Sequence, residues 1–217
     1  MKNSLSFLSK LSKNNNKPWF DENKKEYDAA KKEFIAVVDK LIKNVTKFDP
    51  EMAGLEASKT IFRINRDIRF SKDKTPYKNN FGASINPGGK NSFTSGYYLH
   101  VEAGGKSFLA GGCYMPQPDQ LSAIRQEIDY HPAEFKKILS NKDFVSYFKK
   151  LDEEDKLKTA PKGYEKDNPN IELLKHKHFI VVHNLTDKQV TSPDFTEYCA
   201  KVYKAMLPLN KFLRKAK

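Results

Sequence analysis

The sequence is poor in cysteine and contains no long apolar run. Its two cysteines among 217 residues, Cys113 and Cys199, match no metal-binding or redox spacing, so free thiols in a reducing compartment are expected. Apolar runs such as 179–182 are far too short to cross a bilayer, and Ser and Lys interrupt the N-terminal segment too often for a signal peptide. These features argue against a disulfide scaffold and a membrane partner, and they predict a cytoplasmic protein.

Established catalytic signatures are also missing. The sequence has no nucleophile elbow, no paired-histidine zinc motif and no dinucleotide-binding fingerprint. The segment 104–107 (GGKS) imitates the end of a phosphate-binding loop, but His100 occupies the position of the leading glycine. Three late histidines (His176, His178 and His183) differ in strand parity and lack a supporting carboxylate, so we predict neither a metal site nor a cofactor.

Positive charge is abundant. The net charge of +12 favours encounters with anions, whether small metabolites or nucleic acid. Apolar residues make up only 38% of the chain, yet fifteen Phe and ten Tyr can fill a sizeable core. Neither an internal repeat nor a low-complexity tract is visible, and residues 1–217 are therefore expected to form a single domain.

Hydrophobic periodicity predicts strands in the middle of the chain and helices at both ends. Apolar residues at spacings of three and four indicate a short helix at 5–11 and one continuous helix from Pro18 to about Val45. Further helices are expected from Pro118, through 135–148, and after Ser192-Pro193 with an interruption at Pro208. The expected strands are 60–64, 81–85, 97–103, 107–114 and 179–185. This order predicts an α+β fold in which a central, mostly antiparallel sheet is packed by helices from both chain ends.

The two strands around Gly104-Gly105 are expected to form a hairpin with a two-residue turn. That register would place Tyr98, His100 and Glu102 on one face, opposite Gly111, Leu109 and Ser107. A histidine beside a carboxylate is a common general acid or base, so we regard Tyr98, His100 and Glu102 as candidate catalytic residues. The alternative is an ordinary exposed sheet face of mixed polarity.

The segment 63–81 (RINRDIRFSKDKTPYKNNF) concentrates arginine at three-residue spacing. Because the guanidinium fork suits carboxylate and phosphate, the segment is a candidate anion site. Its candidate ligand-binding residues are Arg63, Arg66, Asp67, Arg69, Asp73, Lys74, Tyr77 and Lys78, and Arg125 from a later helix joins them. Two alternatives remain open: internal Arg–Asp pairs that hold a loop in place, and a strip that follows a nucleic-acid backbone.

The sequence resembles a widespread, mainly bacterial family of conserved hypothetical proteins that is defined only as a domain of unknown function. The resemblance covers nearly the whole chain, from Asn16 and Trp19 to 173–175, and is most specific at 63–78. It is carried by Arg63-Ile64, Arg66-Asp67, Arg69-Phe70-Ser71, Asp73-Lys74, Pro76-Tyr77-Lys78, Tyr98, His100, Gly111-Gly112, Tyr114, Pro116, Ile124-Arg125 and Pro161-Lys162-Gly163. The resemblance implies that the central motif is shared family chemistry, and it brings no established activity with it.

Three functions are compatible with these residues. The first is a domain, enzymatic or not, that recognises a phosphate- or carboxylate-bearing ligand through an Arg/Lys clamp. The second is a nucleic-acid-binding module in which the same cations contact phosphates and Phe70 or Tyr77 stacks on bases. The third is a structural or interaction protein whose arginines form an internal network. No reaction and no oligomeric state is assigned.

Overall fold

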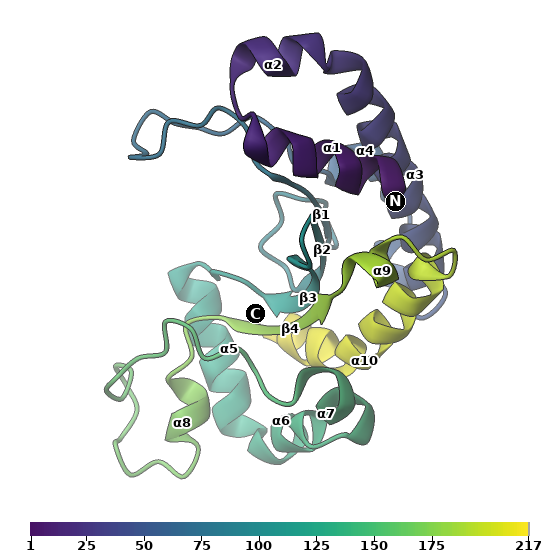
Figure 1. Ribbon diagram of the computed structural model, residues 1–217. Coiled ribbons are helices and arrows are strands. Elements are labelled where there is room, and N and C mark those ends of the chain that lie inside the picture. The colour runs from purple at the N-terminus through teal and green to yellow at the C-terminus, as the bar shows by residue number, and fades with distance from the viewer. Residues whose placement is uncertain (217) are drawn as a thin grey trace.

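A four-stranded antiparallel sheet lies at the centre of the molecule (Figure 1). The computed structural model describes residues 1–216, and its strands follow the chain order β1-β2-β3-β4 across the sheet. Their bounds are β1 (Asn80–Ile85), β2 (Gly96–Glu102), β3 (Ser107–Cys113) and β4 (Phe179–Leu185). Each strand pairs antiparallel with the next, as in a meander. The predicted strands at 81–85 and 179–185 are confirmed.

Helices precede, interrupt and follow the sheet in sequence, which confirms the α+β class. Their bounds are α1 (Lys2–Lys13), α2 (Lys17–Glu22), α3 (Lys24–Thr46), a 3-10 turn η1 (Pro50–Met52), α4 (Ala57–Thr60), α5 (Pro118–Tyr130), α6 (Pro132–Leu139), α7 (Lys142–Phe148), α8 (Ile171–Leu174), α9 (Asp187–Val190) and α10 (Phe195–Lys215). From the two chain ends, α1, α3 and α10 contact the sheet. Within residues 1–216, no helix combines the length and the apolarity needed to span a membrane.

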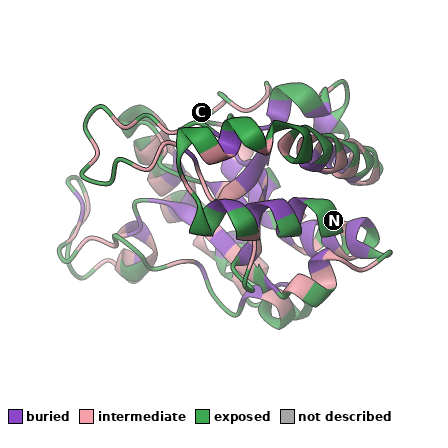
Figure 2. Ribbon diagram, turned by 45° about the horizontal axis from the view of Figure 1, so that its top comes forward, coloured by how far each residue is buried: buried purple, intermediate pink, exposed green. Residues whose placement is uncertain are grey.

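One face of the sheet is buried and the other is only half-buried. Along β2, Tyr97, Leu99 and Val101 are buried, and the residues between them are of intermediate exposure. The buried side chains join one hydrophobic cluster that extends from Leu5 to Leu213. Figure 2 shows the same arrangement, with buried residues along the strands and on the inward sides of the helices. This one-sided burial leaves the second face available for function.

The expected single helix from Pro18 to Val45 is divided at Asn23, which corrects the prediction. Asn23 lies between α2 and α3 with φ −101° and ψ 19°, and its side-chain amide donates to the Trp19 carbonyl at 2.8 Å. An asparagine that bonds nearby backbone in this way competes with helix continuation. At the start of α2, the Asn16 side chain accepts a hydrogen bond from the Trp19 N–H and caps the helix.

Two further predictions of local structure are wrong. The expected strand 60–64 is instead the end of α4 followed by a single bridge between Ile61 and Ala83. The Thr60 hydroxyl donates to the Ala57 carbonyl at 2.8 Å and closes that helical turn. The C-terminal helix α10 runs through Pro208 without a break, because Pro208 is exposed and buried neighbours such as Met206 and Leu209 hold the helix to the core.

The β2–β3 hairpin differs from its prediction by one residue in register. His100 pairs with Phe108 and Tyr98 pairs with Ala110, whereas the two-residue turn would have paired His100 with Leu109. Gly104 and Gly105 both have positive φ. The Ser107 hydroxyl accepts a hydrogen bond from the Glu102 N–H and donates one to the Glu102 carbonyl, so the turn contains one residue more than predicted. A shift of one residue exchanges the two faces of a strand, so β3 turns Phe108 toward His100 and Leu109 toward the core.

Candidate functional site

Residues 65–78 form an arm that leaves the β1 edge of the sheet and projects from the molecule, at the upper left of Figure 1. Its two sides are joined by backbone hydrogen bonds from Arg66 N–H to Pro76 O (2.9 Å) and from Lys78 N–H to Ile64 O (2.8 Å). An isolated antiparallel bridge between Asn65 and Tyr77 continues this pairing. The arm is therefore an ordered extension of the sheet edge.

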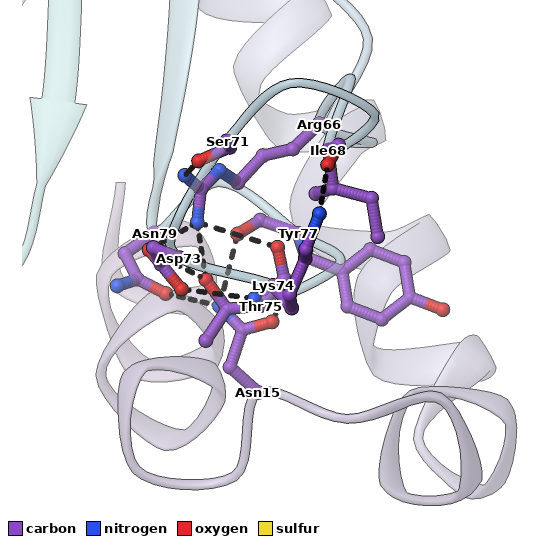
Figure 3. Close-up of polar contacts among 9 residues, drawn as sticks. All are labelled: Asn15, Arg66, Ile68, Ser71, Asp73, Lys74, Thr75, Tyr77 and Asn79. Atoms are coloured by element: carbon purple, nitrogen blue, oxygen red, sulfur yellow. Dashed lines mark hydrogen bonds and ion pairs between the residues drawn. The ribbon is translucent and has the colours of Figure 1, made fainter.

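Arg66 is at the centre of a polar network inside the arm (Figure 3). Its guanidinium donates to the Asp73 carboxylate and to the Thr75 hydroxyl, and at longer range to the Ser71 hydroxyl (3.4 Å). The pKa of Asp73 is lowered to about 2, first by the backbone hydrogen bond from Thr75 and then by the hydrogen bond from Arg66. These contacts match the internal-network alternative for Arg66 and Asp73.

Three more charged residues at the arm tip are also engaged locally. Arg69 binds Asp67 through two hydrogen bonds of 3.0 and 2.7 Å, and these lower the pKa of Asp67. The Lys74 ammonium donates to the Ile68 carbonyl at 2.9 Å and closes the tip (Figure 3). Both acids of the arm are thus paired with arginines of the arm.

Asn15, from the loop after α1, fastens the arm to the N-terminal helices. Its side chain accepts from Tyr77 N–H (3.1 Å) and donates to Tyr77 O (2.9 Å), as a neighbouring strand would. It also donates to the Asn79 side chain at 2.9 Å. No local pattern indicates this role, because 62 residues separate Asn15 from Tyr77.

We expect Asn15→Asp to loosen the arm. The substitution removes the donors to Tyr77 O and Asn79 and places a negative charge beside a carbonyl, so a cost of about 1–3 kcal/mol in unfolding free energy is expected in urea titrations. Trypsin should cleave the variant faster than the wild type after Arg69 or Lys72. Asn14→Asp is the matched control, because the Asn14 side chain bonds only Lys10 O of its own helix. Equal cleavage of both variants would contradict the tether.

Arg63 and Lys78, at the base of the arm, form no ion pair among residues 1–216, and the same is true of Lys72 and Lys74 at the tip. The Lys78 pKa is lowered by burial first and then by the nearby positive charge of Arg63. The Lys78 ammonium lies 5.6 Å from the centre of the Phe62 ring, and that ring lies 6.2 Å from the ring of Tyr98. Lys78 therefore lies at the edge of the half-buried sheet face, and Arg63 is near enough to act on its pKa.

Tyr98, His100, Glu102 and Phe108 form what we call the open face. The His100 Nε2 atom is 3.0 Å from a Glu102 carboxylate oxygen, and the imidazole stacks on Phe108 with centroids 4.5 Å apart and an interplanar angle of 12°. Burial raises the pKa of Tyr98 to about 12, so its hydroxyl stays protonated. That hydroxyl lies over Gly82, where a Cβ would come within 2.5 Å of it.

The other two predicted site residues have structural contacts. Tyr77 is buried and stacks on Phe20 with ring centroids 4.0 Å apart. Arg125 donates to Leu174 O (2.8 Å) and His176 O (3.1 Å), and burial lowers its pKa. It holds the chain that leads from α8 into β4. No group of three or more potential metal ligands occurs within residues 1–216.

Two features of the site region went unnoticed in the sequence. The Phe62 ring lies between the Lys78 ammonium and the Tyr98 ring, and the only hint of this in the sequence is that Phe62 directly precedes the motif. Phe108 stacks on His100, and only the correct hairpin register could have placed it there. Both are aromatic rings whose neighbours come from other segments.

Together the fold and the site define an α+β protein with a one-sided antiparallel sheet, an ordered basic arm and a histidine–carboxylate pair on the open face. The chain belongs to the family of conserved hypothetical proteins DUF2461, whose family model matches residues 3–212. No curated protein and no solved structure matches the chain.

Proposed function

We propose that this protein binds an anionic ligand, bearing phosphate or carboxylate, where the arm meets the open face. The observation that carries the proposal is the pair of cations at Arg63 and Lys78: neither forms an ion pair among residues 1–216, and the charge of Arg63 is near enough to lower the Lys78 pKa. Arg63 also acts on Asp67, but that carboxylate is already bound by Arg69. Two like charges held close together raise the free energy of the empty site, and an anion relieves this repulsion. The guanidinium offers a bidentate fork and the ammonium a point charge.

In this proposal the open face supplies orientation and proton transfer. His100 has a carboxylate partner 3.0 Å away, the arrangement that fixes the tautomer of a general acid or base. Tyr98 keeps its proton and can donate a hydrogen bond. The arm that presents Lys78 is held by the contacts of Arg66, Asp67, Arg69, Asp73 and Lys74. Arg125 does not contact the ligand in this proposal; its hydrogen bonds to Leu174 O and His176 O position the segment that leads into β4.

We also propose a cytoplasmic location and a single domain. Cys113 and Cys199 are both free and buried, which supports work in a reducing cytoplasm. One buried cluster includes residues from Leu5 to Leu213, which supports a single domain over 1–217.

Thermal unfolding with panels of anions tests the proposal. Inorganic phosphate, pyrophosphate, nucleoside phosphates and dicarboxylates should include at least one ligand that, at about a hundred times its dissociation constant, adds about 2.7 kcal/mol of stability. For a domain of this size that is about 5–10 °C in Tm. Lys78→Ala should lose most of this shift, and the His100 ring signals in NMR spectra of the wild type should move on addition of the same anion.

Lys72→Ala is the matched control, because it removes one exposed positive charge from the same arm. It should retain the ligand-dependent shift. Equal shifts in wild type, Lys78→Ala and Arg63→Ala, or no shift with any anion in the panel, would contradict the proposed function.

A further inference from the structure

The tip of the arm presents one aromatic ring entirely to solvent. Phe70 is 95% exposed, whereas Phe93, the next most exposed phenylalanine, is 54% exposed. Burying a phenylalanine contributes about 1.5–3 kcal/mol, and Phe70 gains almost none of this in the fold. A ring held in this way can gain that free energy only from a second molecule.

The arm holds this ring on an ordered support. The Arg66 network, the Arg69–Asp67 pair and the Lys74–Ile68 hydrogen bond surround the tip on both sides of Phe70. The Asn15 bracket fixes the base of the arm. Because the loop is ordered by these bonds, binding at Phe70 does not have to supply the entropy cost of ordering it.

Positive charge surrounds the ring. The Arg69 guanidinium lies 5.8 Å from the Phe70 centroid, and the exposed Lys72 lies two residues further along the chain. From Arg63 to Lys78 the sequence has six basic residues against the two acids Asp67 and Asp73, within a chain of net charge +12. The tip therefore attracts a polyanion and offers it a free π-face.

We propose that the arm tip binds single-stranded nucleic acid, with Phe70 stacked on an unpaired base and the surrounding cations on adjacent phosphates. A paired base is already stacked on both faces, so an unpaired strand fits the ring better than a duplex does. A membrane surface fits less well, because an interfacial anchor needs a broad apolar face and Phe70 is here accompanied only by the half-buried Ile68. This proposal is independent of the anion site at Arg63 and Lys78.

Fluorescence anisotropy with a labelled single-stranded oligonucleotide of about 20 nucleotides tests the proposal. Phe70→Ala should weaken binding about 5-fold to 150-fold, which corresponds to about 1–3 kcal/mol for one stacked base. The dependence on salt should be unchanged, because no phosphate contact is lost. Phe93→Ala, the exposed-ring control on the β1–β2 loop, should bind like the wild type.

A second variant reports on stacking directly. The chain has a single tryptophan, Trp19, so Trp19→Phe combined with Phe70→Trp leaves the only indole at the arm tip. Its fluorescence should be quenched by the oligonucleotide, and it should bind at least as tightly as the protein with Trp19→Phe alone.

Unchanged affinity in Phe70→Ala, or an indole at position 70 that the oligonucleotide does not quench, would overturn the proposal. Binding to anionic lipid vesicles without binding to oligonucleotide would overturn it in favour of a membrane surface. The thermal shift by small anions separates this result from the proposed function, because Phe70→Ala should leave that shift intact.

Discussion

Replacing Arg214 with alanine is expected to lower the free energy of unfolding by about 3–5 kcal/mol, because it leaves a buried carboxylate without its partner. The side chains of Arg214 and Asp49 are 7% and 1% exposed, and two hydrogen bonds of 2.9 and 3.0 Å join them. Arg214 also donates to Ser95 O, and Asp49 accepts from the Tyr97 hydroxyl at 2.8 Å. The cluster fastens the end of α10 to the segment after α3.

Lys215→Ala is the control for the neighbouring position. Lys215 pairs with Glu134 at 2.6 Å, but both side chains are about half exposed, so its loss should cost less than about 1 kcal/mol. Urea titrations of the two variants and the wild type measure the difference. Equal destabilisation by both substitutions would show that the Arg214 pair contributes no more than a surface contact.

The same cluster should contribute to acid sensitivity. Burial alone would raise the pKa of Asp49, but the hydrogen bonds from Arg214 and Tyr97 outweigh it and hold the pKa below its ordinary value. A lowered pKa in the folded state stabilises the protein above the unfolded-state pKa of about 4, and this contribution is lost as pH falls through the folded-state pKa. Stability below about pH 4 should therefore decline less steeply in Asp49→Asn than in the wild type. Parallel pH profiles in urea would contradict this assignment.

Gly112→Ala is expected to be the most damaging glycine substitution in the sheet. Gly112 has φ +115°, and a Cβ there would lie 2.0 Å from Phe179 O and 2.9 Å from Ile180 Cα, both backbone atoms of β4. The strained φ costs about 1–3 kcal/mol and the backbone collision at least a similar amount. We expect a loss of at least about 2 kcal/mol in urea unfolding, or failure of the β3–β4 pairing.

Gly111→Ala is the adjacent comparison. Its Cβ would meet the Met206 Sδ atom at 2.4 Å, and a methionine side chain can move where a strand backbone cannot. Gly111→Ala should therefore cost less than Gly112→Ala. The reverse order would mean that packing against α10 matters more than the approach of β4.

The hairpin shows how far local pattern could reach. Alternation in 97–103 correctly placed Tyr98, His100 and Glu102 on one face, because side chains in a strand have a period of two. The register to the next strand depended on the turn, where Ser107 bonds both backbone groups of Glu102. A glycine pair alone does not specify that geometry. The residue opposite His100 was therefore predicted to be Leu109, whereas it is Phe108.

The sequence by itself determined the α+β class, the buried face of β2 and the family, because periodicity and motif are local properties of the chain. The tertiary structure decided which arginines are engaged. Arg66 and Arg69 bind acids of the arm, Arg214 binds an acid 165 residues away, and Arg63 lies beside Lys78. Charges of one type look alike in a sequence, and only the closure of the arm and the docking of α10 bring each one to its partner or leave it without one.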